Sequence, residues 1–85
     1  MRNLLFTDAA WEDYLYWQTE DKKTLKRINE LVRSAQRTPF EGIGKTEALQ
    51  ENLSGYWSRS IDQEHRLVYQ ASDDQLTVIA CRYYY

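Results

Sequence analysis

The sequence predicts an α+β domain in which one strand is followed by two helices and then by three or four antiparallel strands. Apolar residues recur at helical spacing in the first half of the chain, alternate with polar residues in the second half, and are separated by turn-forming residues. The 85 residues are enough for one modest hydrophobic core. We therefore expect a single domain over residues 1–85, with both helices on one face of a mainly antiparallel sheet of four to five strands.

The first strand and the first helix are predicted at the start of the chain. Asn3–Phe6 is a short apolar run that favours a strand, and Thr7 or Asp8 provides an N-cap for the following helix. The apolar positions of this helix are Ala10, Trp11, Tyr14, Leu15 and Trp17. Burial alone explains a stripe with this period, so we expect core residues rather than a platform for stacked bases.

The second helix is predicted to begin after Asp21, which is suited to cap it, and to end before Pro39. Its apolar stripe consists of Leu25, Ile28, Leu31, Val32 and Ala35. Between Lys22 and Arg37 the chain carries six basic residues and one acidic residue, Glu30. These cations form either a solvated helix face or a surface that docks a polyanion, and the pattern by itself leaves both interpretations open.

A flexible connection follows over residues 39–45. It contains Gly42 and Gly44, but the glycine spacing does not match a phosphate-binding loop. Residues 47–49 favour a short strand or a helical turn.

A β-hairpin is predicted from Gly55 to Ala71, with its turn at residues 62–64. Its strands carry Arg59 and Arg66, which we expect to project outward from the sheet. A guanidinium group suits a phosphate better than an ammonium group does, so the two arginines suggest a phosphodiester substrate. The last strand is predicted over residues 76–83, with the apolar run 78–81 typical of a central strand.

Several classes of site are disfavoured by the composition. One His and one Cys do not provide a metal cluster, and Cys81 cannot form an internal disulfide. A nucleophilic triad is also disfavoured, and a structural hydrogen bond is the expected role of His65.

The apolar run 4–6 is too short for a signal peptide or a membrane span, so we expect a cytoplasmic protein without cofactor, metal or membrane contact.

The net charge of −2 argues against a freestanding nucleic-acid binder, which is normally basic. Any polyanion would have to meet the basic second helix rather than the whole surface.

The order of the motifs resembles the YoeB (Txe) toxins of the RelE superfamily over the whole chain. The matching segments are Trp11-Glu12-Asp13-Tyr14, Lys26-Arg27-Ile28-Asn29-Glu30-Leu31, Thr38-Pro39-Phe40-Glu41-Gly42, Asn52-Leu53-Ser54-Gly55-Tyr56-Trp57-Ser58-Arg59, Glu64-His65-Arg66-Leu67-Val68-Tyr69 and Cys81-Arg82-Tyr83. The resemblance implies a RelE-like fold. It also implies a toxin of a type II toxin–antitoxin system that cleaves mRNA on the ribosome.

The resemblance assigns roles to four residues in a metal-independent attack of the ribose 2′-hydroxyl on the adjacent phosphate. Glu47 matches the general base, Arg66 the group that stabilises the phosphorane charge, and Tyr85 part of the nucleotide-binding site, while Tyr84 holds the position of the general acid. Arg59 is then expected to be structural. On composition alone, Glu47 would be a solvated loop carboxylate and Arg66 a strand residue in an ion pair.

The resemblance also implies partners: a YefM-type antitoxin, the ribosome with its mRNA, operator DNA through the antitoxin alone, and a second copy of the chain in a homodimer. Whether the chain is a monomer or a homodimer stays open at this point.

Three positions depart from the family pattern. The family usually ends in Tyr-His-Tyr, whereas Tyr84 stands at the position of the histidine, and Gln50 and Ser60 replace basic residues. An unperturbed tyrosine has a pKa of about 10 and donates a proton less readily than an imidazole near neutrality. We therefore expect slower cleavage.

The alternative function is a catalytically weak toxin fold retained for antitoxin binding and operator autoregulation. A third function, that of a ribosome-independent nuclease, is disfavoured by the net charge.

Overall fold

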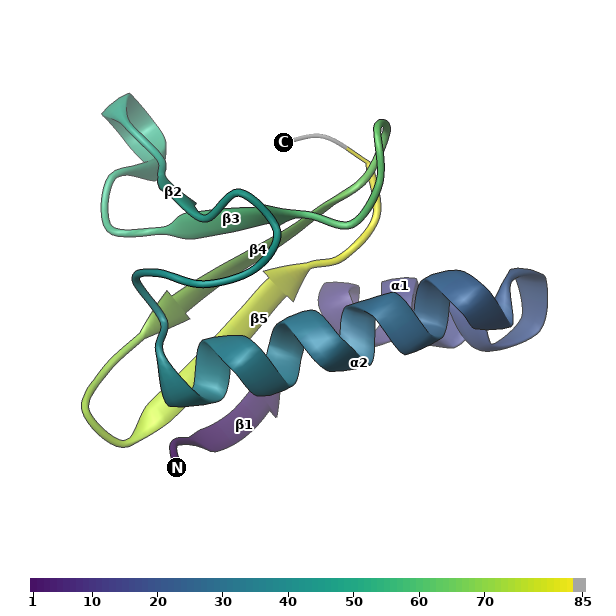
Figure 1. Ribbon diagram of the computed structural model, residues 1–85, viewed down its shortest axis with the longest axis horizontal. Coiled ribbons are helices and arrows are strands. Elements are labelled where there is room, and N and C mark those ends of the chain that lie inside the picture. The colour runs from purple at the N-terminus through teal and green to yellow at the C-terminus, as the bar shows by residue number, and fades with distance from the viewer. Residues whose placement is uncertain (84–85) are drawn as a thin grey trace.

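Two helices cover one face of a five-stranded sheet in the computed structural model, which describes residues 1–83 (Figure 1). The elements are β1 (Asn3–Phe6), α1 (Asp8–Glu20), α2 (Lys22–Arg37), β2 (Glu47–Ala48), a 3₁₀ turn (Glu51–Leu53), β3 (Trp57–Ser60), β4 (Arg66–Ala71) and β5 (Gln75–Ala80). The strand order is β1-β5-β4-β3-β2. This confirms the predicted α+β class.

Both helices begin at the predicted caps. The Thr7 hydroxyl accepts a hydrogen bond from the Ala10 amide (3.2 Å), and Asp21 accepts bonds from the amides of Lys23 and Thr24. Each cap satisfies backbone N–H groups that lack a partner within the helix. None of the helices within residues 1–83 is both long enough and apolar enough to cross a membrane.

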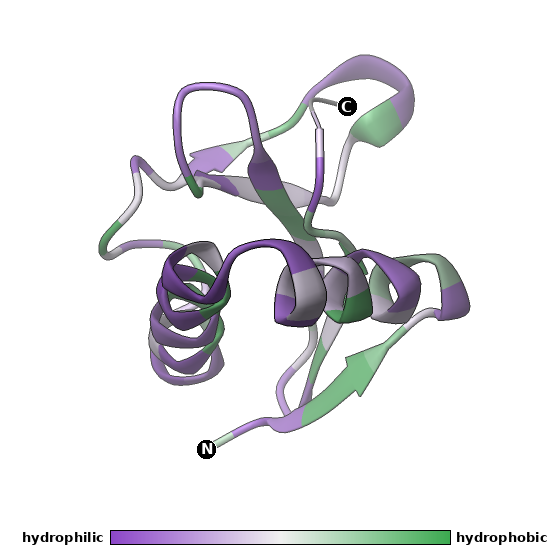
Figure 2. Cartoon of the chain, turned by 90° about the vertical axis from the view of Figure 1, so that its right-hand side faces the viewer, coloured by the Kyte–Doolittle hydropathy of each residue, from purple (hydrophilic) through white to green (hydrophobic). Residues whose placement is uncertain are grey.

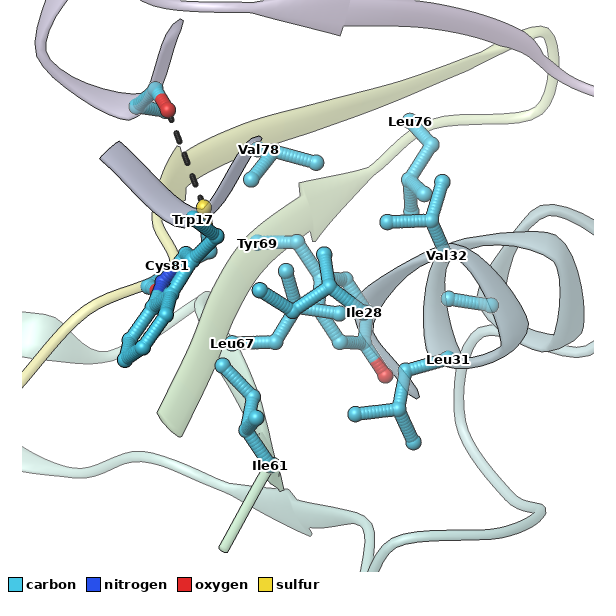
Figure 3. Packing of buried hydrophobic residues seen from close by; sticks show 12 residues of the cluster. Trp17, Ile28, Leu31, Val32, Ile61, Leu67, Tyr69, Leu76, Val78 and Cys81 are labelled. Carbon is cyan, nitrogen blue, oxygen red and sulfur yellow. Dashed lines mark hydrogen bonds between the residues drawn. The ribbon is translucent and has the colours of Figure 1, made fainter. Parts of the chain in front are cut away.

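The core lies between the helices and the strands β4 and β5. Figure 3 shows Ile28, Leu31 and Val32 of α2 facing Tyr69 and the neighbouring strand residues. On the helix side of the sheet the fully buried aliphatic side chains are Leu67, Leu76 and Val78, whereas Val68 is buried on the opposite face, where it pairs with Ser58. The helices therefore bury one face of a sheet whose inner strands are β5, β4 and β3.

Cys81 closes one end of this core. Trp17 Nε1 donates a hydrogen bond to the Cys81 carbonyl oxygen (2.8 Å), and the thiol contacts the Ala10 carbonyl oxygen (3.7 Å; Figure 3). Burial, followed by the charge of Asp13, raises the pKa of the Cys81 thiol to about 12. The thiol is therefore protonated and unreactive at neutral pH.

The pairing of β1 with β5 is parallel, whereas the other three strand pairs are antiparallel. Asn3 lies opposite Gln75 and Phe6 opposite Val78. Figure 2 shows β1, next to the N label, as a hydrophobic strand, and Leu4 and Leu5 keep 44% and 43% of their surface exposed at this edge of the sheet.

Two expectations from the sequence are wrong in part. Trp11 was expected in the core, but it is 47% exposed and stacks on Tyr14 with ring centroids 5.4 Å apart. It lies close to the edge strand β1, with its ring against that of Phe6. The last strand was expected to run to residue 83, but β5 ends at Ala80 because residues 81–83 leave the sheet and bind α1 and the β-hairpin.

Candidate active site

Alternation along the strands places Glu47, Ser58 and Arg66 together on the sheet face opposite the helices, which we call the site face. Glu47 of β2 pairs with Ser58 of β3, and Ser60 pairs with Arg66 of β4. Directly opposed residues of an antiparallel pair point to the same side of the sheet. Leu67 and Tyr69 of β4 point to the other side, into the core under the helices.

An ion pair and two hydrogen bonds fix Arg66 at the site face. Its Nη2 lies 2.8 Å from Glu47 Oε1, and its Nε and Nη2 donate to Ser58 Oγ at 3.2 and 3.0 Å. The Ser58 side chain is fully buried, whereas the Glu47 side chain is 54% exposed and that of Arg66 is 12% exposed. The Arg66 guanidinium group thus binds the buried Ser58 hydroxyl on one side and the solvent-accessible Glu47 carboxylate on the other.

A shallow hollow of about 400 Å³ lies beside Arg66. It is lined by Lys45, Ser60, Asp62, Gln63 and Arg66. Two of these residues are cations. The Asp62 carboxylate oxygen is committed to the turn, since it accepts the amides of Glu64 and His65 at 2.8 Å each. The hollow therefore suits an anionic ligand next to Arg66.

The loop before β2 positions Glu47 by packing closely against α2 and β3. The Gly44 carbonyl oxygen accepts the Ser60 amide at 2.6 Å, and Gly44 has a φ of +90°. A Cβ atom at Gly44 would lie 2.7 Å from Leu31 Cδ2. Glycine is required here both by the backbone conformation and by this close approach.

Arg59 does not belong to this site, so the expectation that both hairpin arginines project outward is wrong. Arg59 pairs with Leu67 and lies with it on the helix side of the sheet, where it is fully buried. Its guanidinium group donates to five oxygens: Tyr69 Oη, Ser34 Oγ and the carbonyls of Thr38, Glu41 and Ile43. Strand alternation explains the difference, because Arg59 lies between Ser58 and Ser60 of the site face. Its role is structural.

Residues 81–83 are anchored on both sides. The Cys81 amide donates to Asp13 Oδ2 (3.0 Å), while the Tyr83 amide donates to His65 Nδ1 (2.7 Å) and the Tyr83 carbonyl accepts the Arg66 amide (3.1 Å). The structural hydrogen bond expected of His65 is therefore confirmed. Two of the predicted site residues, Tyr84 and Tyr85, lie outside the described residues.

The structure thus brings together two of the four predicted site residues, Glu47 and Arg66, and adds two that sequence reasoning missed. Ser58 could have been found from strand alternation, since it lies two residues from Ser60. Strand alternation could not indicate Lys45, because Lys45 lies in the loop before β2 and has a φ of +53°. Gln50 is exposed after β2. Residues 1–83 contain no group of three or more His, Cys, Asp or Glu side chains placed to hold a metal ion.

The outer face of α2 forms a second, basic surface. A hollow of about 630 Å³ is lined there by Lys26, Asn29, Glu30, Arg33, Ser34, Arg37 and Thr38. Three of these residues are cations and one is acidic.

Comparison with known proteins identifies the family. Residues 6–85 match the model of the YoeB-like toxin of bacterial type II toxin–antitoxin systems. Toxin YoeB of Escherichia coli K12 is 57% identical over 82 residues, which cover 96% of this chain and 98% of that protein.

Two solved structures from Staphylococcus aureus share the fold. A YoeB dimer superposes with a TM-score of 0.92 and 49% identity, covering 99% of this chain and 98% of that chain. A heterotetrameric YoeB–YefM toxin–antitoxin complex contains a chain that superposes with a TM-score of 0.90 and 49% identity, covering 100% of this chain and 99% of that chain. The chain therefore belongs to the YoeB family of type II toxins and has the RelE-like fold of that family.

Proposed function

We propose that this toxin is an endoribonuclease that cleaves mRNA on the ribosome and thereby inhibits translation. The observation that carries the proposal is the 2.8 Å contact between Glu47 and Arg66 above the buried Ser58 hydroxyl. It places a half-exposed carboxylate beside a fixed cation. Attack on a phosphodiester by its neighbouring hydroxyl needs this pair of groups.

In the proposed reaction Glu47 takes the proton of the ribose 2′-hydroxyl, and the 2′-oxygen forms a bond to phosphorus. Arg66 stabilises the charge that develops on the phosphorane oxygens. The bond from phosphorus to the 5′-oxygen then breaks, and Tyr84 supplies the proton for the leaving oxygen while Tyr85 contributes to nucleotide binding. The products are a 2′,3′-cyclic phosphate and a 5′-hydroxyl, and no metal ion takes part.

Reduced activity is part of the proposal. A tyrosine at position 84 donates its proton with less driving force than an imidazole at neutral pH. Ser60 faces the hollow beside Arg66, where the family commonly carries a cation. Each lost cation is expected to cost roughly 3 kcal/mol of transition-state stabilisation, which Lys45 at the same hollow offsets in part.

The basic outer face of α2 is the surface we assign to ribosomal RNA. Lys26, Arg33 and Arg37 line one hollow there, on the same helix as three further cations. This local charge offsets the net charge of −2 of the whole chain. The ribosome, rather than this chain alone, then presents the mRNA.

Two protein partners complete the proposal. A YefM-type antitoxin inhibits the toxin and carries it to operator DNA, in line with the Staphylococcus aureus complex. The chain also forms a homodimer, as that organism's YoeB does, and the exposed apolar residues Leu4, Leu5 and Trp11 are the surface we assign to it.

Cleavage is tested by incubating the purified protein with programmed ribosomes and mapping cuts by primer extension. We expect a cut in the codon of the A site, its loss in Glu47→Gln, and full retention in Glu51→Gln as the matched control. The absence of any cut at high protein concentration would refute the proposal. Cutting of naked RNA that is abolished by Glu47→Gln would instead support a ribosome-independent nuclease.

The second candidate is a catalytically weak toxin fold retained for antitoxin binding and operator autoregulation. The observation that favours it is the tyrosine at position 84, where the family has its histidine. Expression of Tyr84→His in bacteria separates the two candidates. Growth arrest restored by this substitution would show a nuclease limited by its acid, whereas continued growth would favour the binding role.

A further inference from the structure

We propose that His65 is a positioning residue for the cleavage, because its ring nitrogen fixes the backbone of Tyr83, the residue that directly precedes Tyr84 in the sequence. The inference rests on the proposed nuclease function and adds to it a residue that need not touch the substrate. It follows from the contacts of Tyr83, from the packing of the His65 ring and from the chemistry of the accepting nitrogen.

Two consecutive hairpin residues hold both polar groups of the Tyr83 backbone. The Tyr83 amide donates to His65 Nδ1 at 2.7 Å, and the Tyr83 carbonyl accepts the amide of Arg66 at 3.1 Å. Tyr83 has a φ of +66°, a left-handed conformation that non-glycine residues adopt only where their surroundings impose it. The His65 ring is thus one of two groups that fix a strained turn one residue before Tyr84.

The His65 ring is itself held in place. Trp17 of α1 packs edge-on against it, with ring centroids 4.8 Å apart at 81°, and the Tyr83 ring lies 5.8 Å away. Asp62 accepts the His65 amide, and only 13% of the side chain is exposed. Because both the backbone and the ring are packed, Nδ1 remains directed at the Tyr83 amide.

Arg82 packs the same segment without fixing its backbone. Its guanidinium group lies 3.4 Å from the centroid of the Tyr16 ring and 4.4 Å from that of the Tyr83 ring. These cation–π contacts favour a guanidinium group over the faces of the rings, but they tolerate rotation of the rings and the guanidinium group relative to one another. The direction of the chain at Tyr83 is therefore set by its two hydrogen bonds.

The contact requires an unprotonated Nδ1. A nitrogen that accepts a hydrogen bond carries no proton, so the neutral ring holds its proton on Nε2, which lies 3.9 Å from the Glu64 carboxylate. The other groups around the ring are the uncharged rings of Trp17 and Tyr83, the Arg82 guanidinium stacked on Tyr83, and Asp62 at the backbone amide. In the imidazolium form a second N–H would face the Tyr83 N–H, and the anchor would be lost.

Two substitutions separate this hydrogen bond from the packing of the ring. His65→Asn places a side-chain oxygen close to the position of Nδ1, whereas His65→Phe keeps the ring and removes the acceptor. We expect His65→Phe to lower the single-turnover cleavage rate on ribosomes by at least about tenfold at unchanged ribosome affinity, and His65→Asn to stay within about threefold of the parent protein. Glu64→Gln is the matched neighbour control and should cleave normally.

The conservative variant provides a readout that ring packing alone would not change. His65→Asn restores a hydrogen-bond acceptor without restoring the ring, so its cleavage rate should clearly exceed that of His65→Phe. Parent-like cleavage by His65→Phe at neutral pH, or cleavage by His65→Asn as slow as that by His65→Phe, would overturn the inference.

Hydrogen exchange separates a failure of the inference from a failure of the proposed function. We expect the Tyr83 amide to exchange faster in His65→Phe than in the parent protein, at equal stability to urea. A parent protein that does not cut RNA would refute the nuclease proposal. Unchanged exchange in His65→Phe would refute the anchoring role of His65 whatever the activity.

Discussion

Arg59 and Arg66 lie on adjacent strands of one hairpin, yet they occupy opposite chemical environments. Arg59 is fully buried on the helix side and donates to five oxygens, of which three are backbone carbonyls. Arg66 lies on the site face, where it contacts the half-exposed carboxylate of Glu47. The residue type is the same, but the face of the strand on which it lies separates the structural role of Arg59 from the catalytic role that we propose for Arg66.

The difference lies in what each guanidinium group organises. Arg59 organises the connection from α2 to β2, because carbonyls of this connection point toward its guanidinium group. The Tyr69 hydroxyl completes the network by donating to the Pro39 carbonyl. Arg66 instead contacts the Glu47 carboxylate, which a substrate can approach from solvent. We therefore expect substitutions on the helix side to change stability and substitutions on the site face to change activity.

The largest effect is expected for Arg59→Met, which keeps an unbranched side chain but removes every donor. It leaves several buried oxygens unpaired, and we expect the free energy of unfolding to fall by about 4 kcal/mol. Urea denaturation monitored by tryptophan fluorescence measures this change. Activity per folded molecule should remain within about threefold of the parent protein. A variant of normal stability would contradict the structural role of Arg59.

The next effect is expected for Arg66→Gln, which removes the cation but retains a polar side chain. Cleavage on programmed ribosomes should fall by about 100- to 1000-fold, as for the loss of one donor to a developing charge. The free energy of unfolding should change by less than about 1 kcal/mol, because the partner carboxylate is more than half exposed. Equal losses of activity and stability would remove the distinction between the two arginines.

A smaller effect is expected for Tyr69→Phe, which removes only one hydroxyl from the Arg59 network. That hydroxyl accepts from Arg59 Nε (3.0 Å) and donates to the Pro39 carbonyl. Losing both bonds in a buried site should reduce the free energy of unfolding by about 1–2 kcal/mol, with cleavage unchanged. Thermal and urea unfolding of the two proteins in parallel provide the measurement.

The smallest effect is a loss of stability at high pH. Burial raises the pKa of the Tyr69 hydroxyl above its ordinary value of 10.0, although Arg59 opposes part of this shift. A group whose pKa is higher in the folded state contributes its full stability below the unfolded pKa, and this contribution is lost as the pH rises through the folded value. Urea unfolding from pH 8 to pH 11 should show this decline, and Tyr69→Phe should show less of it.

Much of the fold could be predicted because its signals are local. Thr7 and Asp21 cap their helices by contacts within a few residues, and Pro39 lies directly after the C-cap residue of α2, Thr38. The parallel pairing of β1 with β5 was not predicted, since no local signal connects Asn3 with Gln75. The exposure of Trp11 was missed for a similar reason, because helical spacing does not reveal where the sheet ends.

The site was less accessible to sequence reasoning than the fold. Glu47 and Arg66 were singled out by resemblance to the YoeB family, whereas composition alone favoured a loop carboxylate and an ion-paired arginine. The ion pair expected of Arg66 is confirmed, with Glu47 as its partner, but Glu47 lies in strand β2 rather than in a loop. The burial of Arg59 depends on carbonyls of residues 38, 41 and 43, whose inward orientation is a tertiary property that no sequence motif shows.

The parallel pairing of β1 with β5 has a consequence for the timing of synthesis. β1 is among the first segments to leave the ribosome, but its partner is the last strand of the sheet to be made. Contacts so distant in sequence form late, since the chain must close a long loop to reach them. Arg66 and residues 81–83, which bind α1 and the β-hairpin, also leave the ribosome late. We therefore expect the toxin to complete its sheet and its candidate site only after nearly the whole chain has been translated, so that a nascent copy lacks a complete site during most of its synthesis.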